Sequence, residues 1–449
     1  MSETGSSTAA GKYSWYRDLN RYQWFVVAVA SIGWMFDTMA QQLFNLARQP
    51  ALRDLLGGRA PGVIAEQAGY STMIFMIGWA LGGVIFGVLG DRLGRAKTMI
   101  LTILTYTIFT GLSLFSVTVW DFDAYRFLCG LGVGGQFAVG VALVAEVVPE
   151  RARPYALGTL QALSAFGNML AALTGILLGQ IEQAGAIGHA WRWEFLAGAL
   201  PAPLALVVFK KLKEPEQWVK ASAEKKKLGS YSELFSDPRW RRNAIVGFLL
   251  AFAGVVGLWG IGFFSYDLFR PVLERTFRAQ GLTGAALDGK TTLWIGWTSM
   301  FQNFGAFFGI YGFTYLTHYT GRKKAFAISF LAAMGMTAYT FWNLKQISDI
   351  FWMVPLMGFA QLALFGGYAI YLPELFPTRL RSTGTSFCYN VGRLVAAAGP
   401  LTLGTLTRRV YAGYTDPMRY AGVTMCLVFL VGLAALPFAP ETKGKPLPE

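Results

Sequence analysis

The sequence predicts an all-α membrane protein with twelve transmembrane helices in two pseudo-symmetric six-helix bundles. Hydrophobic residues make up 54% of the chain and charged residues only 14%, against roughly 25% in soluble domains. Twelve apolar segments approach the length of about 20 residues that a helix needs to cross a bilayer. Two charged motifs also recur at nearly the same spacing, which indicates an internal repeat.

The twelve predicted spans are apolar and rich in glycine, and short polar stretches separate most of them. The 52 glycines of the chain suit helices that approach one another closely in lipid. The spans are predicted at residues 23–45, 71–89, 98–117, 124–147, 155–179, 193–210, 243–267, 292–316, 325–344, 350–373, 385–407 and 418–438.

Lysine and arginine concentrate in every second connection, which predicts that these connections and both termini are cytoplasmic. We therefore expect a multi-pass protein of the cell (inner) membrane. The predicted parts are a cytoplasmic N-terminal segment, an N-terminal six-helix bundle, a basic cytoplasmic linker, a C-terminal six-helix bundle and a cytoplasmic tail, at residues 1–22, 23–210, 211–242, 243–438 and 439–449.

The first outer connection, residues 46–70, is unusually long. Its first part, Leu46–Leu56, has apolar residues at helical spacing and predicts a short amphipathic helix. Such a helix would either cap the outer vestibule or lie on the bilayer surface.

The repeat is carried by two pairs of motifs. Gly90–Lys97 (GDRLGRAK) follows the second span, and Thr317–Lys324 (THYTGRKK) follows the eighth. Glu146–Arg153 (EVVPERAR) follows the fourth span, and Glu374–Arg381 (ELFPTRLR) follows the tenth, 228 positions later. These pairs predict two parallel six-helix halves related by an axis along the membrane normal.

Composition also excludes several classes of protein. The net charge of +14 is placed by membrane topology, so we expect no nucleic-acid partner. The three cysteines and two histidines lack metal-ligand spacing, so no metal site is predicted. The glycines 130, 132 and 135 match a dinucleotide fingerprint formally, but they lie inside a continuous apolar helix, so we expect no cofactor.

These motifs resemble those of the major facilitator superfamily, and the resemblance covers the whole chain. Gly90–Lys97 is similar to its loop between helices two and three, and Arg126–Gly135 (RFLCGLGVGG) to its fourth-helix motif. Both half-terminal runs, Glu214–Trp218 and Pro440–Gly444, resemble the sugar-porter branch. Pro373–Arg379 and Gly392–Arg393 look closer to metabolite and aromatic-acid symporters.

Asp37 is the only acid that the sequence places deep in the first half. An ionised carboxylate in hydrocarbon is costly, so it should face a cavity and have a partner. We predict that Arg126 of the fourth span is that partner, because the resemblance implies that a first-helix acid and a fourth-helix arginine couple transport to protons. The alternatives are a static structural ion pair and an acid that lies near the outer interface of the membrane.

The substrate is expected to contact polar side chains that face a central cavity. Arg393 could neutralise an anionic substrate through its guanidinium, or it could be a scaffold residue. The other candidates supply amide or hydroxyl groups; they are Gln41, Gln136, Gln161, Asn168, Gln302, Asn303, Gln361, Tyr368 and Asn390.

Acids and arginines at the cytoplasmic ends of the spans predict a gate that breaks when the site opens inward. The candidates recur in the two halves; they are Asp91, Arg95, Glu146, Arg151, Arg153, Arg322, Glu374, Arg379 and Arg381. The alternative is interfacial charge that only fixes topology.

The function predicted from the sequence is proton-coupled symport of a small polar metabolite, in particular an organic acid, by alternating access. The alternatives are a sugar symporter or facilitator and, in a different class, a non-transporting membrane sensor. No catalytic cluster is present, so an enzyme is not expected. The expected partners are a small-molecule substrate, protons and membrane lipid, and the chain is expected to act as a monomer.

Overall fold

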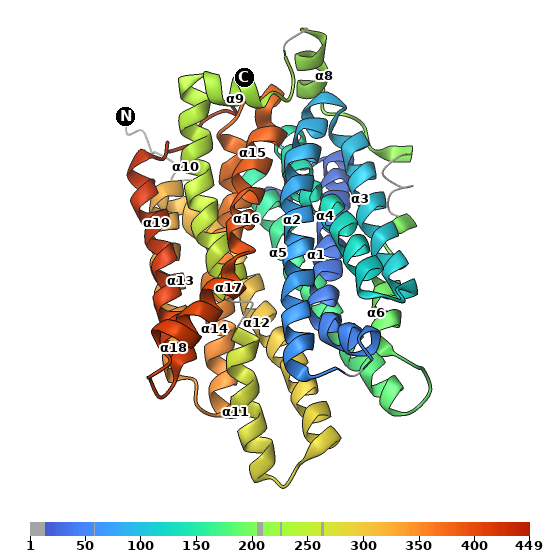
Figure 1. Cartoon of the computed structure of the whole chain (residues 1–449). Coiled ribbons are helices and arrows are strands. Elements are labelled where there is room, and N and C mark those ends of the chain that lie inside the picture. The colour runs from blue at the N-terminus through green and yellow to red at the C-terminus, as the bar shows by residue number, and fades with distance from the viewer. Residues whose placement is uncertain (1–13, 58, 204–209, 225–226, 262–264) are drawn as a thin grey trace, which may run out of the picture.

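The computed structural model describes residues 14–57, 59–203, 210–224, 227–261 and 265–449, and all its regular elements in these ranges are helical (Figure 1). Most of the predicted segment 1–22 and parts of the predicted spans 193–210 and 243–267 lie outside these ranges. Within them, eight helices are long and apolar enough to cross a membrane. Twelve transmembrane segments in two bundles account for the architecture, as predicted.

The described N-terminal half contains five helices that overlap the first five predicted spans and a sixth, α6, that covers residues 193–198 of the span predicted at 193–210. They are α1 (Arg21–Leu55), α2 (Pro61–Arg92), α3 (Arg95–Leu112), α4 (Val119–Val147), α5 (Arg153–Gln183) and α6 (Ala190–Gly198). Asn20 caps α1 by accepting from the backbone N–H of Gln23, and Thr118 caps α4 by accepting from the backbone N–H of Asp121. Gly94, with a φ of 108°, turns the chain between α2 and α3.

The C-terminal half is less regular. Its unbroken helices are α12 (Gly284–Thr320), α13 (Arg322–Asn343) and α14 (Ile347–Glu374). The seventh span is α10 (Pro238–Val255) with a π-helical turn, Val256–Ile261, and α11 (Ser265–Ala279) follows. The eleventh span is divided into α15 (Arg381–Asn390), α16 (Gly392–Ala396), α17 (Gly399–Thr405) and a π turn (Leu406–Val410). The twelfth span is divided into α18 (Pro417–Met425) and α19 (Phe429–Ala435).

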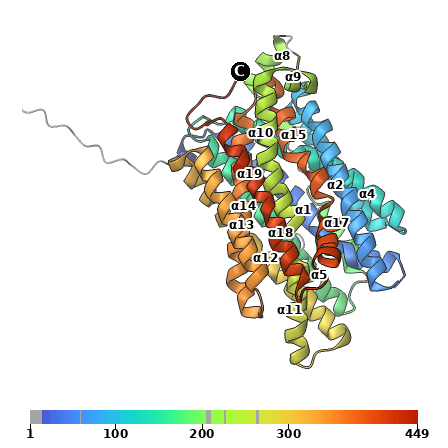
Figure 2. The same ribbon diagram turned by 60° about the vertical axis from the view of Figure 1, so that its left-hand side comes forward.

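The two halves stand side by side, with the connecting segment across one end of the molecule (Figures 1 and 2). This segment holds α8 (Glu216–Ala223) and α9 (Tyr231–Ser236), and we call the end that carries it the linker end. At the opposite end, α11 and the start of α12 project as a hairpin, because α12 with 37 residues is longer than a bilayer requires.

Two of the sequence-based boundaries need correction. The stretch Leu46–Leu56 is not a separate amphipathic helix, because α1 continues through Pro50 to Leu55 and buries Ala47, Ala51 and Leu52. Inside the predicted linker 211–242, α10 begins at Pro238, because Asp237 caps it by accepting from the backbone N–H groups of Arg239 and Trp240.

Glycines allow α2 and α4 to touch backbone to backbone. A Cβ placed on Gly82 would lie 2.0 Å from the carbonyl oxygen of Leu131, and one on Gly134 would lie 2.1 Å from that of Trp79. These glycines therefore serve close helix packing in the N-terminal half. Across the molecule, the halves meet where α2 and α4 contact α15 and where α5 contacts α12 and α14.

Candidate functional site: a central cavity closed at the linker end

A cavity lies between the two halves. Its wall combines aromatic rings with amides and carries one charged side chain, Arg393, among the described residues. The lining residues are Trp34, Thr38, Gln41, Gln42, Asn45, Trp79, Gln161, Ser164, Asn168, Leu258, Trp259, Gln302, Asn303, Leu362, Phe365, Tyr389 and Arg393. Such a wall suits a small ligand with a flat apolar body and few polar groups.

The guanidinium of Arg393 is held between two aromatic rings. Its Cζ lies 4.0 Å from the ring centroid of Trp79 in α2 and 4.3 Å from that of Tyr389 in α15. Nη1 donates to the carbonyl oxygen of Tyr389 at 2.5 Å and to Oδ1 of Asn390 at 3.2 Å. Nε of Arg393 and Nε1 of Trp79 are buried and have no partner within the described structure. Arg393 thus brings a positive charge to the cavity wall and has a buried N–H group without a described partner.

Amides line the rest of the cavity and link the halves. Asn168 donates to Oδ1 of Asn303 at 2.8 Å, and Gln42 donates to Oγ of Ser299 at 3.0 Å, so both bonds join an N-terminal helix to α12. Trp34 donates to Oε1 of Gln161 at 3.1 Å. The structure thus places Gln41, Gln161, Asn168, Gln302, Asn303 and Arg393 of the predicted substrate residues on the cavity wall.

The other four predicted substrate residues do not line the cavity. Gln136 accepts from Thr102 of α3, and the hydroxyl of Tyr368 donates to the carbonyl oxygen of Leu250. Gln361 lies behind Gln302, whose amide points toward it at 3.5 Å, and itself donates to Thr337. Asn390 donates to the carbonyl oxygen of Gly134. These hydrogen bonds serve helix packing, although Nε2 of Gln136 is buried without a partner among the described residues, and Asn390 also positions Arg393.

Asp37 is fully buried in α1, one turn before the cavity residue Gln41. Its Oδ2 accepts from Nε2 of Gln41 at 3.0 Å, and its Oδ1 has no partner among the described residues. Asp37 therefore contacts the cavity through one amide rather than lining it directly.

The predicted pairing of Asp37 with Arg126 is not made in this structure. Arg126 donates to Oγ of Ser113 and to the carbonyl oxygen of Phe109, and its Cζ lies 5.8 Å from the ring centroid of Phe44. Phe44 is seven residues beyond Asp37 on α1, a rise of about 10 Å. Arg126 is thus nearer the end of the molecule opposite the linker.

Sequence reasoning missed several buried groups. Trp79 and Tyr389 hold Arg393, yet nothing in their apolar surroundings distinguishes them in the sequence from packing aromatics. Besides the predicted gate acids Asp91 and Glu146, two acids of the first half, Asp123 and Glu194, are buried, with exposures of 5% and 7%. Neither of them lines the cavity.

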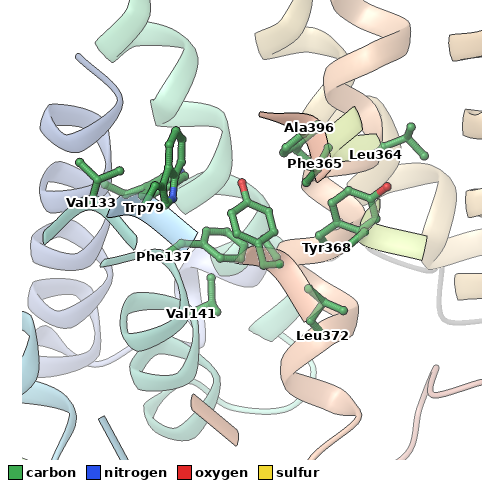
Figure 3. Close-up of a cluster of buried hydrophobic side chains, with 14 of the residues drawn as sticks. Trp79, Val133, Phe137, Val141, Leu364, Phe365, Tyr368, Leu372 and Ala396 are labelled. Carbon is green, nitrogen blue, oxygen red and sulfur yellow. The ribbon is translucent and has the colours of Figure 1, made fainter. Parts of the chain in front are cut away.

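An apolar layer closes the cavity toward the linker end. The ring of Phe137 in α4 stacks on that of Tyr389, and Tyr389 meets Phe365 and Tyr368 of α14 edge-on. Figure 3 shows Trp79, Val133, Phe137 and Val141 of the N-terminal half on one side of this cluster and the α14 residues Phe365, Tyr368 and Leu372 on the other. All of these side chains are at least nine-tenths buried, so water does not cross the layer in this state.

Between this layer and the linker end, buried ion pairs join the two halves. Arg95 contacts Asp91 at 2.7 Å and Glu146 at 2.9 Å, and Arg381 of the other half contacts the same Glu146 oxygen at 2.7 Å. Asp91 also accepts from the backbone N–H groups of Ser382 and Thr383 in the first turn of α15. Among the predicted gate residues, Asp91, Arg95, Glu146 and Arg381 thus form one cluster that crosses the interface.

The remaining predicted gate residues act within smaller groups. Arg322 contacts Glu374 at 2.8 Å inside the C-terminal half. Arg153 donates to the carbonyl oxygen of Ala145, Arg379 pairs with Glu233 of α9, and Arg151 is exposed.

The second half repeats a capping device of the first. Glu214 accepts from the backbone N–H of Arg95 at the start of α3, and Glu441 accepts from that of Arg322 at the start of α13. Partial burial acts to raise the pKa of the Glu441 carboxyl, but the backbone N–H groups of Arg322, Lys443 and Lys323 hold that pKa below its ordinary value. Glu441 therefore remains ionised at neutral pH.

Comparison with known proteins agrees with this architecture. The family model described as Major Facilitator Superfamily matches residues 24–400. The niacin transporter NiaP of Acinetobacter baylyi is 26% identical, with 96% of each chain covered, and the cis,cis-muconate transport protein of the same organism is 28% identical, with 76% of this chain and 78% of that protein covered. The proton:xylose symporter XylE superposes with a TM-score of 0.74 over 95% of this chain and 98% of its own, at 16% identity, which shows the shared fold. The chain belongs to the major facilitator superfamily and is a multi-pass membrane transporter.

Proposed function

We propose that this protein is a proton-coupled symporter that takes up a small organic acid by alternating access. The linker end is proposed to face the cytoplasm of a cell with an inner membrane, as the lysine and arginine distribution predicts. The state described here is then closed to the cytoplasm by the Phe137–Tyr389 layer and by the Glu146 cluster.

The observation that carries the proposal is the setting of Arg393. A guanidinium that is 1% exposed is expensive to keep without a counter-charge, and this one has a buried N–H donor without a partner. A substrate carboxylate accepts from such donors in a charge-assisted, bidentate manner. Relatives are named for niacin and for cis,cis-muconate, which are both small unsaturated carboxylic acids.

Asp37 is the proposed proton site. Its carboxylate is fully buried, accepts only the amide of Gln41 within the described structure, and lies where its charge interacts with Arg393. A carboxylate that is buried with so few partners can gain a proton when the local charge becomes more negative. Movement of that proton with the substrate would let a pH gradient drive uptake.

The amide-rich part of the wall also suits a sugar, which is the second candidate. Gln161, Gln302, Asn168 and Asn303 would hydrogen-bond hydroxyl groups from both halves of the molecule. A neutral sugar, however, would leave the charge of Arg393 without a counter-ion, so we rank this candidate below an organic acid.

The experiment that tests the proposal is a thermal-shift screen of the purified protein against small carboxylic acids, their amides and sugars. We expect a carboxylic acid to raise the unfolding temperature of the protein. Its amide should need a concentration at least about tenfold higher for the same rise, because a charged hydrogen bond is lost. Hits are then tested for uptake into proteoliposomes under an imposed pH gradient. Stabilisation by sugars and not by acids would replace this proposal with the sugar candidate.

A further inference from the structure

We propose that Asn390 is a positioning residue that links closure of the linker end to the ligand affinity of Arg393. Because the ligand in question is the carboxylate that Arg393 receives, this role rests on the proposed function. The cavity should bind its ligand more tightly while the linker end is closed than while it is open, and Asn390 should carry that difference.

The side chain of Asn390, the last residue of α15, is fully buried and uses its whole amide at once. Nδ2 donates at 3.0 Å to the carbonyl oxygen of Gly134 in α4 and at 3.0 Å to Oγ of Ser386 in α15. Oδ1 accepts from Nη1 of Arg393 at 3.2 Å. An amide can make such a bridge because it donates and accepts through separate atoms. Asn390 thus connects the N-terminal half to the arginine on the cavity wall.

The N-terminal half forms a close-fitting seat for this amide. A Cβ placed on Gly83 of α2 would lie 2.4 Å from Nδ2 and 2.5 Å from Cγ of Asn390, so glycine is needed there for the amide to fit. The carbonyl oxygen of Gly83 accepts from Oγ of Ser386 at 2.5 Å. These contacts require α15 to lie against α2 and α4, which is the packing that closes the linker end.

The position of Arg393 depends on the same packing. Span eleven is divided at this point, since α15 ends at Asn390 and α16 begins at Gly392. The guanidinium is held by Oδ1 of Asn390, by the carbonyl oxygen of Tyr389 and by the ring of Trp79, which belongs to the N-terminal half. Separation of α15 from α2 and α4 would therefore remove the seat of Asn390 and the ring of Trp79 together. A guanidinium with fewer restraints loses more conformational freedom when it binds a ligand, which lowers its affinity.

Thermodynamic linkage gives this difference a measurable counterpart. A ligand that binds the closed form more tightly by some factor shifts the equilibrium toward the closed form by the same factor. A substrate that enters from outside would thus be held while the linker end is shut and released after it opens. If Asn390 served helix packing alone, it would stabilise the closed form equally with and without ligand. The effect of the ligand on closure therefore separates the two roles.

The test follows closure with the reporter substitution Ser382→Cys. The hydroxyl of Ser382 is buried without a partner among the described residues, and Gly90 of α2 faces it across the interface. The purified protein is labelled with a maleimide, with and without saturating nicotinate or cis,cis-muconate, and the same protein without the reporter gives the background from the native cysteines. With Asn390 in place, the ligand should slow labelling at least about fivefold. In Asn390→Ala, at a saturating concentration determined for that variant, the two rates should agree within about twofold.

Two further variants make the result specific. Thr383→Val removes a hydrogen bond to Asp91 across the same interface, and none of the described contacts of Thr383 involves Arg393. This control should label faster without ligand and keep the full slowing by ligand. Asn390→Leu fills the space of the amide without its polar contacts and should behave as Asn390→Ala does, even if the alanine variant is too unstable to study. Thermal unfolding of each variant reports its folding.

The possible failures are distinguishable. If the ligand slows labelling of the Asn390 variants as much as it does with Asn390 in place, or slows neither, the role of Asn390 is overturned and the proposed function stands. If neither nicotinate nor cis,cis-muconate binds the wild type, the proposed function is overturned, and the role of Asn390 falls with it.

Discussion

The ring of Phe137 in α4 stacks on the ring of Tyr389 in α15, with centroids 3.8 Å apart and planes inclined by 20°. This contact joins the two halves next to Arg393. The carbonyl oxygen of Tyr389 accepts from the guanidinium of Arg393, and the ring of Tyr389 lies 4.3 Å from Cζ of Arg393. The residue that binds the substrate carboxylate in our proposal is thus in contact with the layer that must part when the site opens toward the linker end.

Replacing Phe137 by alanine should loosen that layer. Loss of the stacked pair removes an aromatic contact worth about 0.5–1.5 kcal/mol beyond its buried area, so states open at the linker end should become more populated. A reporter cysteine at Ser386, whose hydroxyl now donates to the carbonyl oxygen of Gly83 across the interface, should then react faster with a maleimide added at the linker end. Phe330→Ala, which removes a buried ring from α13, is the control. Equal labelling of both variants would argue against an interface role for Phe137.

Neutralising Glu146 should have a larger effect on the same reporter. Glu146 is the acceptor shared by Arg95 of its own half and Arg381 of the other, so Glu146→Gln weakens a charge-assisted contact across the interface. Such contacts contribute about 1.5–3 kcal/mol, which corresponds to about a tenfold to hundredfold shift toward the open state. The matched control is Glu374→Gln, since the contacts described for Glu374, to Arg322 and Thr442, stay inside the C-terminal half. Slower labelling of the Glu146 variant would contradict a role in closure.

A variant of Arg126 tests whether this residue couples transport to protons, as the sequence predicts, or stabilises helix packing, as its contacts in the structure indicate. Its partners Ser113 and Phe109 and the face of Phe195 anchor α4 to α3 and α6, so Arg126→Met should lower the thermal midpoint by several degrees. The ratio of protons to substrate should remain that of the wild type. If the variant instead kept its stability and lost coupling, Arg126 would belong to the coupling pair in another state of the cycle.

Helix contact in the N-terminal half should be sensitive to one methyl group. Gly134→Ala would place a Cβ within 2.1 Å of the carbonyl oxygen of Trp79, so α2 and α4 would have to move apart. Overpacking of this kind lowers the free energy of unfolding by about 1–3 kcal/mol. It would also displace Trp79, whose ring lies against the guanidinium of Arg393. We expect a lower thermal midpoint and weaker ligand binding, whereas Gly335→Ala, where nothing lies within 4 Å, should leave both unchanged.

The sequence was sufficient for the fold because its signals are local. Apolar length places the spans, lysine and arginine placement predicts their orientation, and the repeat of Glu146 at Glu374 pairs the halves. The contact between Asp91 and Arg95 could also be anticipated, because one short motif holds both partners. The contact between Arg322 and Glu374 joins two motifs, which the predicted topology places at the same end of the molecule.

The interior of the site could not be predicted in the same way. Most helices of this protein are apolar on all sides, so the sequence does not tell which face turns toward the cavity. Gln136 and Gln161 look alike as isolated amides, yet one accepts from Thr102 in a helix interface and the other lines the cavity. Likewise, the level of Arg126 beside Phe44 depends on how α1 and α4 are offset along their axes, and no local pattern encodes that offset.

The most direct test of the central claim is the movement of protons with substrate. Proteoliposomes that hold a pH-sensitive dye and start with equal pH on both sides receive an inward gradient of nicotinate or of monomethyl muconate. Our account predicts that the lumen acidifies as the substrate enters, in the wild type and not in Asp37→Asn. Entry of substrate into wild-type vesicles with no change in lumenal pH would contradict it.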